Sequence, residues 1–201
     1  MKLYYAPGAC SLSPHIALRE AGLAFEAEKV DLRAKKTQSG GDFLAANPKG
    51  QVPAFVLDDG TLLTEGPAIV QYIADKAPHS GLAPANGVTA RYQLQQWLNF
   101  ISTELHKSFS PLFKPNTPED YKPIARETIA VRFAFVDGAL AGKDYLMGST
   151  FTVADGYLYV MLRWADTMKI DVSGLKNLSA FKTRVIARPA VQAALAEEGL
   201  S

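Results

Sequence analysis

The sequence predicts two domains, an α/β domain in the first 80 residues and an all-helical domain from residue 88 onward. Short apolar runs alternate with helical segments up to about residue 77, whereas no convincing strand occurs after residue 88. The segment 78–87, PHSGLAPANG, is rich in proline and glycine, which is typical of a linker. We therefore place an α/β domain at residues 1–80 and a helical bundle at residues 88–201.

The first domain opens with a predicted strand, helix and strand. Residues 2–5, KLYY, form a short β-rich run. Residues 11–21 have helical periodicity, and Gly22 supplies the expected helix stop. Residues 25–30, FEAEKV, predict the second strand, and residues 33–47 predict a polar connection that contains a short helix. This order is a βαβ unit.

A hairpin and a helix follow. The runs 52–57 and 61–63 flank Asp58-Asp59-Gly60, and an Asp-Gly pair supplies the positive φ angles that tight hairpin turns require. Residues 66–77 predict the next helix, with Pro67 near its first position. The first domain thus reads βαβ, helix, ββ, helix.

The second domain is predicted to contain only helices. Three long helices are expected near residues 88–109, 119–141 and 152–168, and two shorter ones near residues 175–187 and 189–197. In the first of these, Leu94, Leu98, Ile101 and Leu105 fall within about 60° of one another, which predicts a core stripe. Thr152 and Asp155 form a capping-box pattern, which we interpret as structural.

Composition is that of an ordinary globular protein. Hydrophobic residues make up 48% of the 201 residues, and charged residues 20%. The net charge of +1 gives no general electrostatic reason to expect nucleic acid as a partner. One cysteine cannot form an internal disulfide, and no secretory signal or membrane span is apparent. We expect a cytoplasmic protein with no membrane or nucleic-acid partner and no metal.

That single cysteine, Cys10, lies between the first predicted strand and the first predicted helix. Free N–H groups and partial positive charge at a helix start favour a thiolate, so the position suggests reactivity. The alternative is a small buried hydrophobic residue, which is the more common role of a free cysteine. The preceding Pro7-Gly8 turn and the hydroxyls of Ser11 and Ser13 favour the first interpretation.

A second candidate feature is Val52-Pro53, at the start of the third run of strand residues. Proline cannot donate a ladder hydrogen bond, so its presence suggests a special bond geometry such as cis, with the Val52 backbone available to an outside partner. A βαβ unit followed by such a proline and a ββ hairpin is the plan of a thioredoxin-like domain. The Cys-x-x-Cys motif is absent because Ser13 stands three residues after Cys10, so this domain is expected to bind thiols or disulfides.

Glu65 and Gly66 begin the helix that follows the hairpin. Backbone N–H groups at a helix start suit a carboxylate, while the Glu65 carboxylate suits an ammonium group. Together they could hold the head of an α-amino acid. An equally acceptable interpretation of Glu65 is an ordinary acidic residue at a helix start.

The helix 88–109 has a polar face opposite its core stripe. Asn99, Thr103 and His106 lie on that face, with Lys107 beside them. A bundle packed on a thioredoxin-like domain could turn this face toward Cys10. The alternative is a solvated face with an incidental histidine. His15 is interpreted as a helix-face residue and His79 as part of the linker.

Four segments closely resemble the bacterial beta-class glutathione transferases. They are YYAPGACSLSPHIALRE, NPKGQVPAFVLDDGTLLTEGPAI, QWLNFISTELHKSFSPLF and FTVADGYLYV. Their order and spacing agree with the family over essentially the whole chain. The resemblance implies a glutathione transferase fold, with a thioredoxin-like glutathione-binding domain at 1–80 and a helical domain at 88–201 that contributes the site for the electrophile.

The resemblance also implies roles for individual residues. It places Cys10 beside the glutathione sulfur, with which it can form a mixed disulfide, and it makes Cys10, His106 and Lys107 the catalytic group. The glutathione-binding residues that it implies are Cys10, Lys35, Gln51, Val52, Pro53, Glu65, Gly66, Asn99, Thr103, Glu104 and His106. Serine commonly stands at the position of Gly66 in the wider superfamily, so one hydroxyl contact is missing from this chain.

The function implied is conjugation of reduced glutathione to hydrophobic electrophiles, as in detoxification, with glutathione as co-substrate and no other cofactor. Candidate walls for the electrophile are Phe109, Phe113, Trp164 and Met168, although residues of these types more often belong to the core than to a pocket. Thiol–disulfide exchange through Cys10 is a second hypothesis, and a non-catalytic glutathione-fold interaction module is a third. A homodimer is expected by analogy with the family.

Overall fold

The structure, a computed structural model, describes residues 1–200 and divides them into two compact units, each of which is described by itself. The first unit contains residues 1–83 together with 188–200, and the second contains Pro84–Ala187. The boundary at residue 84 falls inside the expected linker. The closing residues, which the sequence analysis assigned to the helical domain, instead group with the first unit because the last helix packs on the first one.

The first unit contains a five-stranded mixed sheet in the order β3-β2-β1-β4-β5. The strands are β1 (Lys2–Tyr5), β2 (Glu26–Asp31), β3 (Lys36–Thr37), β4 (Ala54–Val56) and β5 (Leu62–Thr64). β1 is parallel to β2 and antiparallel to β4, while β4 and β5 form the predicted hairpin. The two-residue strand β3 lies in the stretch that was predicted as a polar connection, since so short a pairing leaves no periodic signal in the sequence.

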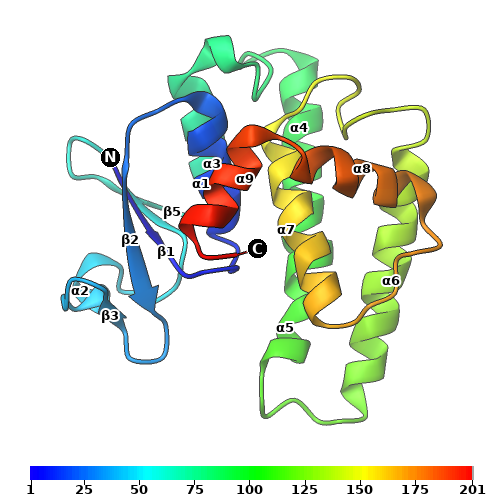
Figure 1. The fold of residues 1–201 in the computed structure, drawn as a ribbon, viewed down its shortest axis with the longest axis horizontal. Helices are drawn as coiled ribbons and strands as arrows, with labels where there is room; N and C mark the ends of the chain where they lie inside the picture. Colours follow the sequence, from blue (N-terminus) through cyan, green and yellow to red (C-terminus); the bar gives the residue numbers. More distant parts are fainter. Residues whose placement is uncertain (201) are drawn as a thin grey trace. The chain divides into compact units, whose positions relative to one another are not determined.

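Four α-helices complete this unit. They are α1 (Leu12–Ala21), α2 (Phe43–Ala46), α3 (Gly66–Lys76) and α9 (Pro189–Glu197), with a 3₁₀ turn, η1, at Pro78–Ser80. α1 packs on α3 and on α9, as Figure 1 shows for the red helix beside the blue one. α1 stops where predicted: Gly22 has φ of 64°, and the N–H of Leu23 donates to the Leu18 carbonyl at 3.2 Å.

The second unit is helical throughout its regular elements. They are α4 (Thr89–Phe100), the π-helical segment η2 (Ile101–His106), α5 (Lys107–Phe113), α6 (Tyr121–Ala139), α7 (Val153–Thr167) and α8 (Lys176–Ile186). α4, η2 and α5 follow one another in a column with α7 beside it (Figure 1). The predicted helix 88–109 is therefore helical over its length, but its hydrogen bonding widens to the π pattern within η2.

The core of the second unit includes the predicted stripe, because Leu94, Leu98, Ile101 and Leu105 are all 0% exposed. The capping box at the start of α7 is also present. Asp155 accepts the Thr152 N–H at 2.7 Å and the Leu146 N–H at 2.8 Å. Burial raises the pKa of the Asp155 carboxyl to about 6, although these hydrogen bonds oppose the shift.

Candidate functional site

Cys10 lies in the turn between β1 and α1, one residue before Ser11, the N-cap of α1. Its thiol donates to the Val52 carbonyl oxygen, with 3.3 Å between Sγ and the oxygen. The Cys10 side chain is only partly buried, whereas Ser11 and Ser13 are buried. The sulfur is therefore not a member of the dry core, which argues against the alternative of a small buried hydrophobic residue.

The Val52-Pro53 peptide bond is cis, as the sequence suggested. Both residues are buried at the point where β4 is about to begin. The Val52 carbonyl oxygen accepts the Cys10 thiol, and its second lone pair is still able to accept from an outside partner. The turn before α1 and the start of β4 thus meet at the sulfur.

Glu65 occupies the N-cap of α3 with φ of 67°, an angle that is rare for residues other than glycine. Its carbonyl accepts the N–H groups of Ala68 and Ile69, both at 3.0 Å. These hydrogen bonds stabilise the backbone turn at the start of α3. Its carboxylate pairs with Lys49 at 2.7 Å, and both side chains are exposed. The sequence analysis did not identify Lys49. Its place in the loop just before Val52-Pro53 was the signal that could have identified it.

Gly66 is the first residue of α3 and lies beside Pro53. A Cβ atom added to Gly66 would come no closer than 4.0 Å to Pro53 Cγ, which is ordinary van der Waals contact. The backbone at this position is not in the left-handed region. Neither packing nor conformation therefore requires glycine here.

Gln51 is part of the turn that leads into Val52, and Lys35 binds the backbone of the same turn. Lys35 Nζ donates to the Gly50 carbonyl at 2.7 Å, and the Lys35 backbone has φ of 56°. Asn47 is buried, and its amide group donates to the Gln51 carbonyl at 2.7 Å. Asn47 was missed by the sequence analysis, because nothing in its immediate neighbours distinguishes a buried asparagine from an exposed one.

In the second unit, His106 ends η2 and is half-buried. Its Nδ1 lies 2.5 Å from the hydroxyl of Tyr157, and its ring stands edge-on to Trp164 with 4.8 Å between centroids. Tyr157 and Trp164 are seven residues apart on α7, so they share a helix face. The histidine is therefore held in place by α7, which argues against an incidental surface residue. The sequence analysis did not include Tyr157.

The other polar residues of this group differ in their surroundings. Asn99, Thr103 and Lys107 are exposed, and the Thr103 hydroxyl donates to the Asn99 carbonyl at 3.0 Å. Glu104 pairs with Arg132 of α6 at 2.7 Å, with both side chains about two-fifths exposed. The predicted polar face is thus present, with His106 at its buried end.

Aromatic side chains surround Trp164. Phe113 lies 4.9 Å from the Trp164 ring and Phe109 lies 5.6 Å from it, measured between centroids. Phe109 is fully buried and belongs to the core, whereas Phe113 is 46% exposed. Of the predicted walls, Phe113 therefore offers the most apolar surface to a ligand.

The predicted site residues fall into two groups. Lys35, Gln51, Val52, Pro53, Glu65 and Gly66 lie with Cys10 in the first unit, and Asn99, Thr103, Glu104, His106 and Lys107 lie in the second. Within residues 1–200, no cluster of three or more His, Cys, Asp or Glu side chains has the arrangement of a metal site. In the same residues, no helix has both the length and the apolar character needed to cross a membrane.

Comparison with known proteins adds independent findings. Residues 1–75 match the family model for the glutathione S-transferase N-terminal domain, and residues 100–189 match that for the C-terminal domain. The chain is 52% identical over 201 residues to glutathione S-transferase GstA of Escherichia coli O157:H7, with both chains fully covered.

Two solved structures are similarly close. A sphingomonad glutathione S-transferase complexed with glutathione is 53% identical with a TM-score of 0.97. The bacterial beta-class enzyme of Sphingomonas chungbukensis is 49% identical, also with a TM-score of 0.97. Each comparison covers both chains completely.

Proposed function

The chain belongs to the glutathione S-transferase family, and on that premise we propose that its first unit binds glutathione beside the Cys10 thiol. The protein is a glutathione transferase that uses glutathione as its co-substrate. The observation that carries the proposed site is the contact of the Cys10 thiol with the Val52 carbonyl, at the junction of β1, α1 and β4. A partly exposed sulfur at a helix start is suited to meeting another sulfur.

The γ-glutamyl head of glutathione binds at the start of α3. Its ammonium group pairs with the Glu65 carboxylate, and its carboxylate accepts the N–H of Gly66, because Pro67 has no N–H and the N–H groups of Ala68 and Ile69 donate to the Glu65 carbonyl. The exposed Lys49–Glu65 ion pair supports this arrangement, because it leaves Glu65 open to a second cation.

The rest of the tripeptide binds along the turn that precedes β4. The backbone of Val52, next to cis-Pro53, pairs with the cysteinyl residue, and Lys35 with Gln51 receives the glycine carboxylate. Lys35 is suited to this because its ammonium group is held by a neutral carbonyl and not by a carboxylate.

The second unit supplies His106 and Lys107 to catalysis, and Asn99, Thr103 and Glu104 to glutathione binding. The His106 hydrogen bond to Tyr157 fixes the ring, and a donor together with a nearby positive charge favours a thiolate. Phe113 provides exposed apolar surface for a hydrophobic electrophile, supported from behind by the buried Trp164 ring. Proximity and thiolate stabilisation then drive conjugation.

A second activity is thiol–disulfide exchange. The Cys10 thiolate attacks a mixed disulfide of glutathione and releases the other thiol, and reduced glutathione then attacks the Cys10 mixed disulfide to give oxidised glutathione. Glutathione is thus the reductant. The partial exposure of Cys10 supports this activity. Cys10→Ala should abolish exchange while conjugation stays measurable.

The protein acts as a homodimer in the cytoplasm. An exposed apolar stripe on α6, formed by Ile124, Val131 and Phe135, supports dimerisation, since each of these side chains is more than half exposed. Phe135 extends the stripe to α4. Its ring centroid lies 5.1 Å from that of Phe100 and 6.2 Å from that of Trp97.

The site is tested by intact mass measurement and conjugation assays on the full chain. Mass before and after reductant reports any glutathione held on Cys10. We expect His106→Gln to lower kcat for conjugation at least tenfold and to raise the pKa of the bound glutathione thiol, because an amide N–H is a weaker hydrogen-bond donor to a thiolate than an imidazole N–H. His79→Gln, which changes an exposed histidine of η1, is the control and should have no effect.

Two outcomes would contradict the proposal. Equal rates for wild type, His106→Gln and His79→Gln would remove His106 from catalysis. No conjugation and no retention on immobilised glutathione by the wild type would favour the non-catalytic interaction module.

A further inference from the structure

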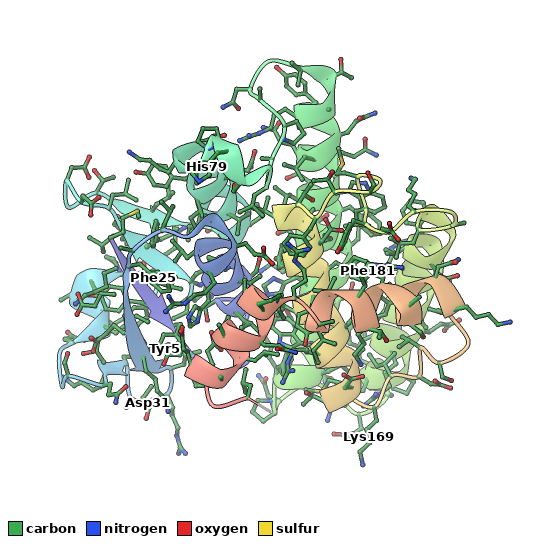
Figure 2. The ribbon with its side chains drawn as sticks, turned by 45° about the horizontal axis from the view of Figure 1, so that its top comes forward. Tyr5, Phe25, Asp31, His79, Lys169 and Phe181 are labelled. Carbon is green, nitrogen blue, oxygen red and sulfur yellow. The ribbon has the colours of Figure 1, made fainter. Side chains whose placement is uncertain are left out.

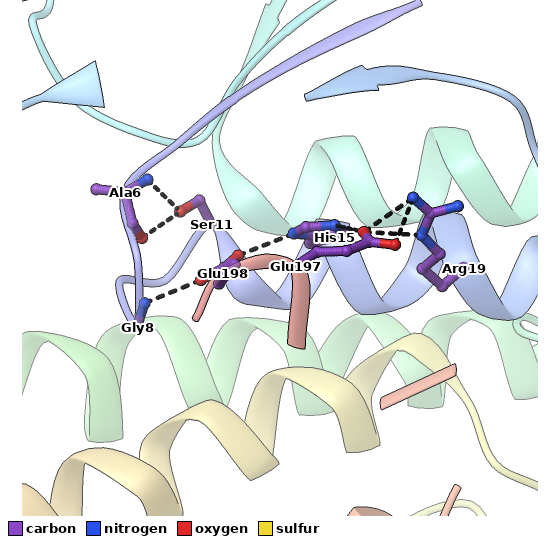
Figure 3. Close-up of polar contacts among 7 residues, drawn as sticks. All are labelled: Ala6, Gly8, Ser11, His15, Arg19, Glu197 and Glu198. Atoms are coloured by element: carbon purple, nitrogen blue, oxygen red, sulfur yellow. Dashed lines mark hydrogen bonds and ion pairs between the residues drawn. The ribbon is translucent and has the colours of Figure 1, made fainter. Parts of the chain in front are cut away.

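His15 connects the end of the chain to the loop that carries Cys10 (Figure 3). The ring is completely buried, with Nδ1 2.9 Å from Glu198 Oε1 and Nε2 2.8 Å from Glu197 Oε2. The other carboxylate oxygen of Glu198 accepts the Gly8 N–H at 2.9 Å. His15 was expected to be a simple helix-face residue, and the structure instead gives it two carboxylate partners.

Each ring nitrogen of His15 faces a carboxylate oxygen, Nδ1 that of Glu198 and Nε2 that of Glu197, so the ring bridges the two glutamates. Arg19 donates to Glu197 as well, so the Glu197 carboxylate contacts both Arg19 and His15. Partial burial opposes ionisation of Glu197, but hydrogen bonds from His15 and Arg19 outweigh it and keep the pKa of Glu197 below its ordinary value.

Other groups around the His15 ring are aromatic. Tyr5 and Phe25, both labelled in Figure 2, have ring centroids 5.6 and 5.5 Å from that of His15. Burial, followed by the charges of Glu198 and Glu197, raises the pKa of the Tyr5 phenol, so Tyr5 adds no negative charge at neutral pH. Glu197 and Glu198 are thus the carboxylate partners that the structure gives to the His15 ring.

Glu198 is itself held firmly by the end of α9. The Leu200 N–H donates to the Leu195 carbonyl at 2.8 Å and the Gly199 N–H to the Ala196 carbonyl at 3.0 Å, which is a Schellman motif with Glu198 at the C-cap. At the other end of α9, Arg188 makes two hydrogen bonds to Glu20. α9 is therefore fixed to α1 at both ends.

The loop from Ala6 to Cys10 has both local and distant attachments, and the Cys10 thiol contact to Val52 is one of the distant ones. The Ser11 hydroxyl contacts both backbone groups of Ala6, at 3.1 Å from N and 3.3 Å from O. Another distant attachment is the Glu198 contact to Gly8, across 190 residues of sequence. Cys10 lies between these contacts and the α1 helix, so displacement of Gly8 would move the sulfur away from Val52.

We propose that Glu198 is a positioning residue for Cys10, which fixes the thiol-bearing loop through the Gly8 N–H, and that His15 holds the Glu198 carboxylate in place. This inference rests on the proposed function only in taking Cys10 as the residue that meets glutathione. Glu198 touches neither the thiol nor the tripeptide in this role. It acts through the backbone of Gly8.

Glu197 provides a matched control for Glu198. Both are adjacent glutamates at the end of α9, and both contact His15, but only Glu198 contacts the loop. A role limited to attaching α9 to α1 would affect both residues alike. A role in positioning Cys10 would affect Glu198 alone.

The test compares Glu198→Ala, Glu198→Gln and Glu197→Ala in the full chain, at a temperature where urea titration shows each variant to be folded. Two quantities are measured for each variant. One is the exchange rate of the Gly8 amide by NMR. The other is the rate at which Cys10 forms a mixed disulfide with oxidised glutathione, which releases one glutathione thiolate.

Glu198→Ala should accelerate Gly8 exchange at least tenfold and slow mixed-disulfide formation by about tenfold or more, because small misplacements of reacting groups are costly. Glu198→Gln should restore both to within about threefold of wild type. Its amide oxygen can accept the Gly8 N–H while its NH₂ group faces Nδ1 of His15. Glu197→Ala should lower the free energy of unfolding yet leave both rates within about twofold.

The proposal is overturned if Glu197→Ala and Glu198→Ala change the two rates equally, or if Glu198→Gln fails to restore them. Failure of the proposed function has a different signature. Wild-type Cys10 would then react with oxidised glutathione no faster than free cysteine does, while Gly8 exchange would still respond to Glu198→Ala.

Discussion

At the scale of single residues, the start of α3 combines a strained backbone at Glu65 with room for a side chain at Gly66. Glu65 has a positive φ angle and presents its carboxylate at the surface beside Lys49. Such backbone conformations are often found where a ligand is held. Gly66, the next residue, has room for a side chain. The missing hydroxyl at this position is thus a difference in ligand contacts and not a packing requirement.

We therefore expect Gly66→Ser to tighten glutathione binding about three- to tenfold, since an added hydrogen bond contributes roughly 0.5–1.5 kcal/mol. Titration calorimetry of wild type and variant measures the change. Gly66→Ala is the matched control, because it adds the Cβ atom without the hydroxyl. Equal affinities for the serine and alanine variants would show that the hydroxyl makes no contact with the tripeptide.

At the scale of elements, two glycines at helix ends are expected to have opposite effects on stability when they are replaced by alanine. Gly138 lies in the last turn of α6, is exposed, and has open space around the position of a Cβ atom. Gly22 also has open space but has φ of 64° at the end of α1. Conformation, and not space, separates the two positions.

Gly138→Ala should raise the free energy of unfolding by about 0.5–1 kcal/mol, because alanine loses less backbone entropy in a helix. Gly22→Ala should lower it by about 1 kcal/mol, because a Cβ atom disfavours the left-handed conformation. Urea denaturation of the two variants measures both effects. A change of the same sign in both variants would refute this account.

Local sequence predicts only part of the structure of the consecutive helical segments α4, η2 and α5. Their apolar stripe is predictable from spacing alone, and all four stripe residues are buried. The π-helical widening at Ile101–His106 was not predicted, because ordinary helical periodicity describes its residues equally well. η2 carries Thr103, Glu104 and His106, and its altered hydrogen bonding changes the direction in which these side chains project.

At the scale of the whole molecule, the apolar stripe on α6 is exposed to solvent in residues 1–200. Ile124, Val131 and Phe135 are 55%, 55% and 57% exposed. Burial of such a stripe against a second copy would remove apolar surface from water, which is the main favourable term in association. This surface is where the proposed homodimer is most sensitive to a charge.

Phe135→Glu should weaken the dimer at least tenfold, because a carboxylate would lie in an apolar interface. Sedimentation equilibrium of wild type and variant at equal ionic strength measures the dissociation constant. Ile186→Glu changes an exposed apolar residue at the end of α8 and is the control. If both variants remain dimers of wild-type affinity, the α6 stripe is not part of the interface.

The sequence by itself determined the order and approximate bounds of nearly all elements, the position of Cys10 between β1 and α1, the cis bond before Pro53 and the family. These features depend on neighbours a few residues apart, such as turn pairs, helix stops and apolar spacing. The tertiary structure alone determined that residues 188–200 join the first unit and that Glu198 holds Gly8. It also determined the Lys49–Glu65 and His106–Tyr157 pairs. Long-range partners leave no local signal, because either residue would look the same in the sequence without the other.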